Sequence, residues 1–378
     1  MAMTAPVTAL YAKELGASDG VAALVVSTMA VSFLCLDLVA SRVVPRIDAR
    51  TALIGGYCVF GIGSFISAVA PNLAVMTAAR ALQGAAVAFP MGAGFHMALR
   101  LSEEGRQGRE IARFNSSAFF GMVVGPLLVG VVAGIAGGVT GIRWGFAVCG
   151  VVNVVTAVVA RLALPSIPSS ERPEWGLPSP EIFAGRRTRL ALAASGLGFG
   201  LRGVAGMTLL PLFGDDIGAG VSGVALATMF MSVSELAGIQ ASGRLSDLVG
   251  RRPVVLAGSL VSALLLLSTL LRPGVGVYLA FSAALGVALS PLRVVPAAMV
   301  VDVARTDELA AMGWRISSDV SSLATALVTS AVLAVVGVAG GFVYAAAAAL
   351  GIGLIALALG ETRPDLVEGG VDPGEVAA

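Results

Sequence analysis

The chain has 378 residues, of which 57% are hydrophobic and only 12% are charged, and its formal net charge is +1. Its mean hydropathy is +0.92. Soluble domains carry about 25% charged residues, and a soluble fold of this length cannot hide so much apolar surface. The composition excludes a soluble globular protein, and the near-neutral charge excludes the basic surface with which proteins bind nucleic acids. The lipid bilayer is the expected surrounding of this chain.

Eleven apolar segments are long enough to cross a bilayer, which takes about 20 residues of helix. Their length and the lack of period-two alternation predict helices rather than strands. The predicted spans are 20–41, 51–70, 73–99, 113–136, 144–163, 190–213, 221–242, 253–271, 276–300, 313–336 and 342–360. Short breaks separate neighbouring spans, namely Pro71-Asn72, Arg272-Pro273-Gly274 and the glycine-rich stretch 337–341. We expect an all-α membrane protein.

Basic residues are distributed unequally between the two sets of alternating loops. The loops 42–50, 100–113, 161–189 and 243–252 contain 3, 4, 5 and 3 arginines. With Arg305 and Arg363 this set holds 17 basic residues, against 3 in the other loops. The excess predicts that the arginine-rich side and the C-terminus are cytoplasmic, in a plasma (inner) membrane. The first 30 residues lack the basic segment of a cleavable signal peptide.

The sequence repeats itself when it is shifted by 202 residues. Basic residues, prolines and glycines then coincide at equivalent places: Gly16 with Gly218, Arg42 with Arg244, Arg50 with Arg252, Pro71 with Pro273, Gly84 with Gly286, and Arg113 with Arg315. This repeat predicts two pseudo-symmetric six-helix bundles, 1–163 and 190–360. A linker rich in proline, serine and charge, 164–189, joins them, and a tail, 361–378, follows.

The repeat also predicts a truncated first helix. Met1 aligns with Gly203, which lies midway through the span 190–213. Residues 1–12 give roughly 18 Å of helix, which is too short to cross the bilayer. Two explanations are open, a true start upstream of Met1 or a truncated gene product.

A charged loop joins the spans 221–242 and 253–271. Its sequence pattern, G-x-x-x-D-x-x-G-R-R, places Gly243, Asp247, Gly250, Arg251 and Arg252 in ten residues. The pattern strongly resembles the signature loop of the major facilitator superfamily of transporters. The resemblance implies that Asp247 holds neighbouring helices through charge and helix-dipole contacts. Arg251 and Arg252 can pair with acids or lipid phosphates, or the charges only set the topology.

The first-half copy of this loop, residues 41–50, departs from the pattern. Pro45 stands at the place of the acid, and Asp48 stands at the place of a glycine. In the family the first copy is usually the better kept. We therefore expect the contacts of this loop to differ in the first half.

The span 73–99 contains Arg80-x-x-Gln83-Gly84, which resembles a motif of the fourth helix in the family. The resemblance implies a link between Arg80 and proton coupling. A buried arginine is costly unless it faces a cavity or a partner. The alternative is a structural arginine bonded to backbone carbonyls.

The span 113–136 contains Gly121, Gly125, Pro126 and Gly130. This pattern looks like the fifth-helix motif of proton-coupled exporters. Small residues permit close helix approach and Pro126 can bend the helix. The motif favours antiport over import, although glycine packing alone explains much of it.

Ionisable residues at membrane depth are rare and often functional. Glu235 is the first candidate for a proton carrier, with Arg293 as its expected partner, and a fixed ion pair is the alternative. Asp37 can be a carrier or a solvated interfacial group. Further proton-coupling candidates are Arg80, Asp319, and His96. The candidates for the substrate cavity are Gln83, Asn115, Arg202, Gln240, Arg293 and Arg315, of which Arg315 can also pair with Asp319 one turn away.

The favoured function is secondary active transport by alternating access, as proton-coupled efflux of a small amphipathic or hydrophobic compound. The motifs resemble those of 12-helix drug:proton antiporters. One alternative is a proton symporter or facilitator that imports a polar or anionic metabolite, with Arg202 and Arg293 as its anion clamp. Another is a degenerate paralogue without transport activity.

Enzymatic activity is not expected. The chain lacks G-x-S-x-G with a partner histidine, a Walker A motif and a metal-ligand cluster, so neither a cofactor nor a metal is predicted. The cysteines, Cys35, Cys58 and Cys149, all lie in apolar segments and are expected to pack as small hydrophobic residues. The expected partners are a small-molecule substrate, protons and the bilayer, and family members generally work as monomers.

Overall fold

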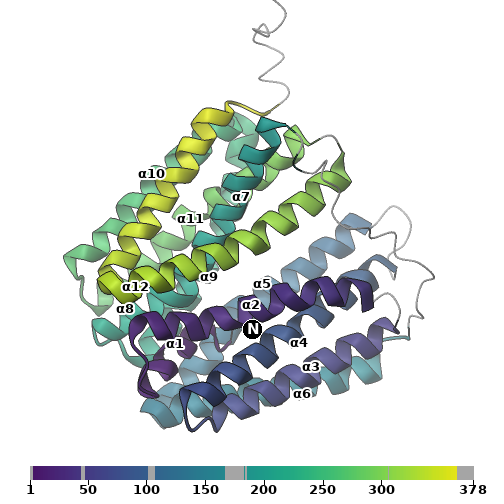
Figure 1. Ribbon diagram of the computed structural model, residues 1–378, viewed down its shortest axis with the longest axis vertical. Helices are drawn as coiled ribbons and strands as arrows, with labels where there is room; N and C mark the ends of the chain where they lie inside the picture. Colours follow the sequence, from purple (N-terminus) through teal and green to yellow (C-terminus); the bar gives the residue numbers. More distant parts are fainter. Residues whose placement is uncertain are drawn as a thin grey trace, which may run out of the picture. The chain divides into compact units, whose positions relative to one another are not determined.

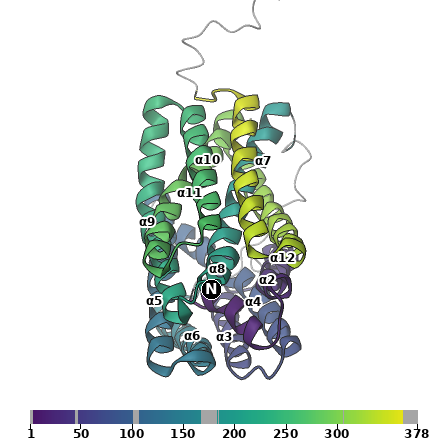
Figure 2. The same ribbon diagram turned by 90° about the vertical axis from the view of Figure 1, so that its left-hand side faces the viewer.

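The computed structural model describes residues 3–43, 47–100, 107–166, 183, 185–304 and 306–363. These ranges are almost entirely helical, with short connections between the helices (Figures 1 and 2). The α-helices are α1 (Ala5–Glu14), α2 (Asp19–Val43), α3 (Ala49–Ala68), α4 (Leu73–Arg100), α5 (Gln107–Ala136), α6 (Gly138–Ala163), α7 (Arg186–Val204), α8 (Leu210–Asp216), α9 (Gly220–Val249), α10 (Arg251–Ser268), α11 (Val275–Val303) and α12 (Asp307–Leu359). A π-helix, η3 (Ala205–Leu209), joins α7 to α8, and a 3-10 turn, η4 (Thr269–Leu271), ends α10.

The predicted spans are confirmed as helices. Among the described residues, nine helices are long and apolar enough to cross a membrane. The last of them, α12, contains both final predicted spans, and Gly337 (φ 75°, ψ −169°) interrupts its helical path between them. Helix α5 covers the predicted span 113–136, and its described apolar part is Phe120–Ala136. The predicted span 190–213 is the continuous path from α7 through η3 into α8.

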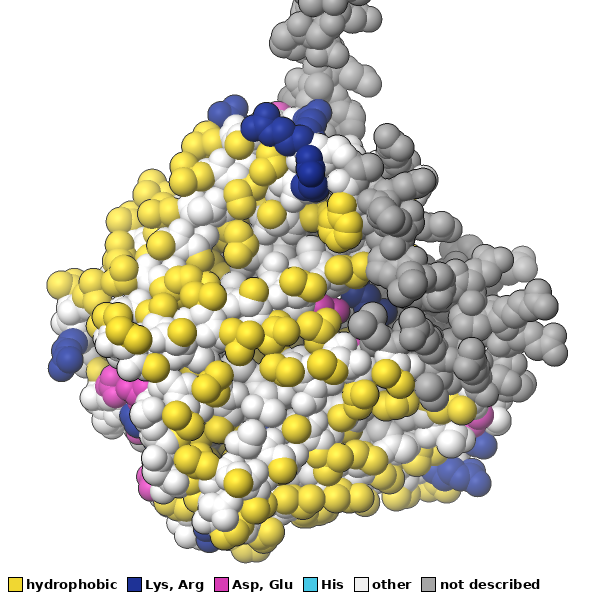
Figure 3. Space-filling model, in the orientation of Figure 1, with side chains coloured by type: hydrophobic (Ala, Val, Ile, Leu, Met, Phe, Trp, Pro, Cys, Tyr) yellow, Lys and Arg dark blue, Asp and Glu magenta, His cyan; other side chains and the backbone are white. Residues whose placement is uncertain are grey.

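Large apolar side chains cover the outer faces of these helices. Figure 3 shows hydrophobic side chains spread over the visible face, with Lys and Arg gathered where α12 ends. Ile135 of α5 is 83% exposed and Val335 of α12 is 85% exposed. Exposed apolar area costs about 25 cal/mol per Å² in water, so this surface requires lipid around it.

Contacts divide the chain into two compact units. Unit 1 is Met1–Gly176 with Leu210–Met229, and unit 2 is Leu177–Leu209 with Phe230–Ala378. Residues 210–229, which hold α8 and the first part of α9, therefore pack with unit 1. The predicted boundaries, 1–163 and 190–360, describe the sequence repeat rather than these contacts and stay a prediction.

The same helix contact occurs inside each unit, at positions 202 residues apart. In unit 1 a Cβ on Gly84 of α4 would overlap the carbonyl oxygen of Met29 of α2. In unit 2 a Cβ on Gly286 of α11 would overlap the carbonyl oxygen of Met231 of α9. Only glycine permits backbones to approach this closely. The equivalence supports the pseudo-symmetric fold predicted from the repeat.

Helix α1 is short, as expected for the first helix, with 10 residues. It is nevertheless well packed, since Tyr11 is fully buried. The Tyr11 hydroxyl donates to the carbonyl of Ala70 at 3.0 Å and accepts from Nε of Arg143 at 3.1 Å. These two bonds fix α1 to the α3–α4 turn and to α6.

Replacement of Gly84 by alanine is expected to separate α2 from α4, because the new methyl group meets backbone rather than a movable side chain. Overpacking of this kind costs about 1–3 kcal/mol. The thermal unfolding midpoint of the purified protein in detergent measures the effect. Gly55→Ala is the matched control, since nothing lies within 4 Å of its added Cβ. Equal midpoints for the two variants would contradict the proposed contact.

Candidate transport site

Three ionisable side chains meet inside unit 2. Arg202 of α7 donates to the Glu235 carboxylate of α9 through Nε at 2.9 and 3.0 Å and through Nη2 at 2.7 Å. Arg293 of α11 donates to the same carboxylate through Nη1. The side chains of Arg202, Glu235 and Arg293 are 9%, 2% and 19% exposed. These three residues are called the buried charge cluster, and their formal charges sum to +1.

Small residues bring the three helices of the buried charge cluster together. A Cβ on Gly198 of α7 would overlap the carbonyl oxygen of Leu292 of α11, next to Arg293. On the other side of α11, Ser290 donates to the backbone carbonyl of Glu235 at 3.1 Å. Gly238, one turn after Glu235, packs against the Ser290 side chain. The backbones thus hold the arginines within reach of the carboxylate.

The buried charge cluster places two arginines against one glutamate, whereas the sequence suggested only Arg293 as a partner of Glu235. Isolated charges at membrane depth are expensive, so mutual pairing stabilises all three groups. Arg202 was expected only as a cavity residue. Its contact depends on how α7 packs against α9, which residue spacing does not reveal. The roles of the three residues in transport stay predictions.

Arg80 of α4 lies in a different environment, inside unit 1. Its side chain donates to Gln83 Oε1 at 2.7 Å and to Met29 Sδ at 2.9 Å, and Gln83 in turn donates to Ser64 Oγ at 3.0 Å. Arg80 is 2% exposed, and its Nε has no hydrogen-bond partner within the described ranges. These hydrogen bonds of Arg80 thus go to neutral acceptors, whereas those of Arg202 go to a carboxylate.

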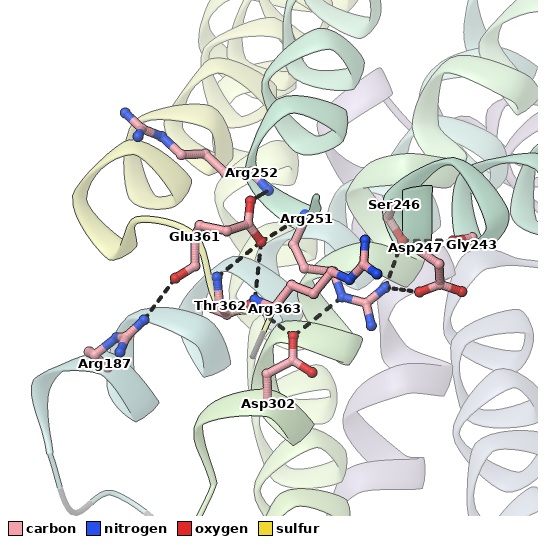
Figure 4. Close-up of polar contacts among 10 residues, drawn as sticks. All are labelled: Arg187, Gly243, Ser246, Asp247, Arg251, Arg252, Asp302, Glu361, Thr362 and Arg363. Atoms are coloured by element: carbon pink, nitrogen blue, oxygen red, sulfur yellow. Dashed lines mark hydrogen bonds and ion pairs between the residues drawn. The ribbon is translucent and has the colours of Figure 1, made fainter. Parts of the chain in front are cut away.

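The signature loop forms the centre of a polar cluster at the arginine-rich end of unit 2 (Figure 4). Arg251 contacts Asp247 of α9, and its Nε donates to Asp302 of α11 at 3.3 Å. Glu361, just after α12, accepts from the backbone N–H groups of Arg251 and Arg252 at 2.9 and 3.1 Å. Arg187 of α7 donates to the Glu361 carbonyl at 2.9 Å. This set, called the Glu361 cluster, joins the ends of five helices.

The signature sequence is not the ten-residue turn expected from the sequence. Helix α9 continues through Gly243 and Asp247 to Val249, and α10 starts at Arg251. Gly250 alone connects the two helices, with φ 99°, a conformation that glycine adopts without strain. The ten-residue estimate was wrong because the apolar pattern ends before the helix does.

The first-half loop satisfies its helix start in another way. Asp48, the equivalent of Gly250, is the N-cap of α3 and accepts from Thr51 N at 3.2 Å. In unit 2 the carboxylate at the equivalent helix start comes from Glu361 instead. The exchange of glycine for aspartate therefore keeps a carboxylate at the positive end of the helix dipole. The expected Pro45 change lies outside the described residues.

The fifth-helix motif packs against other elements of unit 1. A Cβ on Gly125 would meet Met3, and one on Gly130 would lie 2.8 Å from Ala225 Cβ of α9. Ser222 of α9 donates to the Gly130 carbonyl at 3.2 Å. Pro126 is buried inside α5, whereas Gly121 is exposed and has no neighbour within 4 Å. Two of the three glycines thus serve close packing.

The remaining candidates lie on several helices, and their roles stay predictions. Asp37 is buried on α2, and Gln240 is exposed on α9. Arg315 and Asp319 are half-buried one turn apart on α12, and their pairing stays a prediction. The side chains of His96 and Asn115 lie outside the described part of the structure.

The sequence profile of the Major Facilitator Superfamily matches residues 1–241, which is more than half of the chain. The chain belongs to the major facilitator superfamily. The match includes the divergent first-half loop and ends two residues before Gly243. The superfamily consists of membrane transporters rather than enzymes, so this chain is a multi-pass transport protein.

Solved structures agree with this fold. Two are crystal structures of a POT family transporter, one in complex with a thioalcohol-conjugated peptide and one with 5-aminolevulinic acid. Each is 12% identical, with TM-scores of 0.75 and 0.76, and the alignments cover 94% of this chain and 92% of the other. At this identity the likeness shows the fold alone. No curated protein matches the sequence.

Sequence reasoning missed Asp302 and Glu361 as members of the superfamily loop contacts. Both residues follow or end apolar spans, where charged residues are ordinary interfacial groups. The sequence did contain a signal for them: Asp302 shortly precedes Arg305, and Glu361 shortly precedes Arg363, at the ends of two apolar spans. Their partners became visible only when α10, α11 and α12 were placed together.

Replacement of Glu361 by glutamine is expected to weaken the start of α10 by about 1 kcal/mol at neutral pH, as for loss of a helix cap. Burial raises the pKa of Glu361, but hydrogen bonds from the backbone N–H groups of residues 251, 252, 362 and 363 outweigh it and lower the pKa. A lowered pKa means that the carboxylate stabilises the fold above its unfolded pKa and that this contribution disappears as pH falls through the folded pKa.

The difference in thermal unfolding midpoint between Glu361→Gln and the parent measures this contribution. It should be present at pH 7 and shrink once the pH falls below the ordinary glutamate pKa of about 4.3. Glu14→Gln is the control, since Glu14 is exposed at the end of α1 and lies outside the Glu361 cluster. A difference that persists unchanged at low pH would contradict the assignment.

Proposed function

We propose that this transporter carries a small organic anion by alternating access, in symport with protons, and that the buried charge cluster is its binding site. The observation that carries this proposal is the pairing of two cations with one acid: Arg202 and Arg293 both contact the carboxylate of Glu235. The proposal favours the anionic alternative from the sequence over the efflux of a hydrophobic compound.

Electrostatics selects the sign of the substrate charge. An anion that binds beside Arg293 brings the three-residue sum from +1 to zero. A cation would raise the sum to +2 in a setting where solvent screening is weak. Arg293 is the most exposed member of the buried charge cluster, so a ligand reaches it before it reaches Arg202 or Glu235.

The same arrangement predicts the direction of coupling. Protonation of Glu235 removes the negative charge that competes for Arg293, and with an anion bound the cluster sum then stays at +1. A protonated cluster binds an anion more tightly, and by reciprocity a bound anion favours protonation. Proton and anion therefore travel together, which supports symport. Antiport would require a substrate that competes with the proton.

The solved structures offer limited support for the substrate class. The ligand named for one of them, 5-aminolevulinic acid, carries a carboxylate together with an ammonium group at neutral pH. A fold of this kind can therefore accommodate a carboxylate-bearing solute. We extend to this chain only the class of small organic acids.

A second candidate function is the proton-coupled efflux of a small amphipathic compound. The packing of Gly130 against Ala225 and Ser222 favours it, because the resemblance links this fifth-helix motif to exporters.

We further propose that the arginine-rich ends are cytoplasmic in the plasma membrane and that the protein acts as a monomer.

Purified protein in liposomes tests the symport proposal. An inward proton gradient is expected to drive accumulation of labelled acetate or succinate beyond that in protein-free liposomes, into which acetic acid diffuses by itself, and not to concentrate their neutral amides. Arg293→Gln should reduce uptake by about tenfold or more, as for loss of a charge-assisted contact. Arg272→Gln is the control, since Arg272 lies in a turn outside the cluster. Proton-driven exclusion of these solutes would support antiport, and transport of none would contradict the anion assignment.

Glu235→Gln tests the coupling separately. The variant keeps anion exchange at equal pH on both sides but should lose acceleration by the proton gradient. Because the change leaves two arginines without their carboxylate, it also costs about 3–5 kcal/mol of stability. The unfolding midpoint is therefore measured first, and Glu235→Gln with Arg202→Met serves as the stabilised version. Full gradient-driven uptake in either variant would exclude Glu235 as the proton carrier.

A further inference from the structure

An aromatic pair lies directly beside the buried charge cluster. The Arg293 guanidinium lies 5.4 Å from the ring centre of Phe199, which belongs to α7. Phe199 in turn meets Trp314 of α12 edge-on, with ring centres 6.3 Å apart and an interplanar angle of 84°. Three helices of unit 2 thus contribute a guanidinium and two rings to one place.

The exposure of these groups increases away from Glu235. Glu235 is 2% exposed and Arg293 is 19% exposed, and Trp314 reaches 39%. A ligand that contacts Arg293 therefore lies next to Phe199, whose ring leads to the more exposed indole of Trp314. Aromatic rings bind apolar groups at low entropic cost, and Trp also offers an N–H donor.

We propose that Phe199 and Trp314 form an apolar subsite, so that the substrate is a monocarboxylate with an aromatic or bulky aliphatic group. This inference rests on the proposed anion transport and narrows its substrate class. The carboxylate contacts Arg293 while the apolar group lies against the indole of Trp314. A substrate of this kind is also amphipathic, which was the substrate property expected from the sequence.

Binding of phenylacetate, acetate, phenylacetamide and phenethylamine to the purified protein tests the subsite by calorimetry. Phenylacetate should bind at least about tenfold more tightly than acetate, since the ring removes apolar area from water. The neutral amide and the amine should bind more weakly than phenylacetate. In Trp314→Ala the preference for phenylacetate over acetate should fall to about twofold, with acetate affinity unchanged. Trp144→Ala, an exposed tryptophan of α6 in unit 1, is the control.

The outcomes separate this subsite from the proposed function. Equal, Arg293-dependent binding of acetate and phenylacetate overturns the subsite and leaves the anion site intact. Binding of neither carboxylate overturns both. Where Trp314→Ala fails to fold, Phe199→Leu and Trp314→Phe replace it. The subsite is also overturned if both replacements keep the phenylacetate preference and if phenylacetate quenches tryptophan fluorescence equally in the parent and in a variant that keeps only Trp144.

A different observation concerns the arginine-poor ends within unit 1. The α1–α2 and α8–α9 turns have the same backbone structure, with Gly16 at φ 92° and Gly218 at φ 74°. In one turn Gly16 N donates to the Lys13 carbonyl, and in the other Gly218 N donates to that of Asp215, both at 2.9 Å. Lys13 and Asp215 are 202 residues apart, so equivalent positions of the repeat carry opposite charges.

These opposite charges are in contact. Lys13 Nζ lies 2.7 Å from Asp215, 3.3 Å from Asp19 and 3.7 Å from Asp216. Asp19 starts α2, whereas the other two acids end α8. The side chains are between 27% and 45% exposed, so water and salt weaken the contacts without removing them.

We infer that Lys13 is an ionic clamp that holds the α8–α9 turn against the α1–α2 turn and must release it during each transport cycle. Residues 210–229 belong to the second sequence repeat, yet they pack with unit 1. Alternating access requires the two repeats to separate at one membrane face and then at the other. A contact made of partly exposed charges can break and re-form at small cost, unlike the buried charge cluster.

Charge exchange tests the clamp without any substrate. A single cysteine at Ser222→Cys, in a background with serine at positions 35, 58 and 149, reports opening through its labelling rate with an impermeant maleimide. Lys13→Asp and Asp215→Lys should each raise the rate by about three- to tenfold, as expected when a partly exposed ion pair becomes repulsive. The double exchange should restore the parent rate. Arg272→Asp is the control for charge at an arginine-poor turn.

Higher salt should also raise the labelling rate of the parent but not that of Lys13→Met. Unchanged rates in both single reversals would overturn the clamp, as would a double exchange that labels as fast as the singles. Lys13→Met replaces Lys13→Asp where the reversal prevents folding. Because no ligand is added, these results stand apart from any failure of the anion-transport proposal.

Discussion

The pairing of Glu235 with two arginines is the interaction on which unit 2 depends. Three charges lie inside an apolar bundle, and none of them is tolerable there alone. Their pairing requires α7, α9 and α11 to approach at glycine and serine, as Gly198, Gly286 and Ser290 allow. The charges can therefore be paired only where the helix backbones also pack closely. The formal charges of these three residues sum to +1, and on this we base the proposal that the cluster responds to an anion and to a proton.

The two repeats share a fold but distribute their charges differently. Glycine-mediated contacts are kept at Gly84 and Gly286, because any side chain there would separate the helices. The caps of α3 and α10 use carboxylates from different places, Asp48 in one case and Glu361 in the other. Equivalent positions of the two repeats thus keep the same backbone geometry, whereas the carboxylate at the helix start comes from different positions in the sequence.

Alternating access needs contacts of two strengths. The buried charge cluster is deeply placed, and breaking it exposes unpaired charge to an apolar interior. The contacts of Lys13 and those of Asp247 are partly open to water, which lowers the cost of separating them. This difference in the cost of breaking buried and exposed ion pairs suits a protein whose interior must stay folded while its ends open and close.

Apolar length and arginine spacing predicted nearly every helix, since crossing a bilayer imposes a minimum run of apolar residues. Boundaries were less accurate where a helix continued beyond its apolar part, as α9 does through Asp247 to Val249. The three members of the buried charge cluster were also named from the sequence, because charged residues inside apolar spans are rare. Their partners were not, since Arg202 and Glu235 are 33 residues apart and lie on different helices.

The sequence by itself determined the membrane location of the chain, its helical fold and its internal repeat, because hydropathy and the 202-residue offset are properties of residue order. Only the tertiary structure decided which charges neutralise one another. It joined Arg202 and Arg293 to Glu235, Glu361 to the start of α10, and Lys13 to Asp215. These contacts depend on helix rotation and on close approach at glycine, and neither can be deduced from a single sequence.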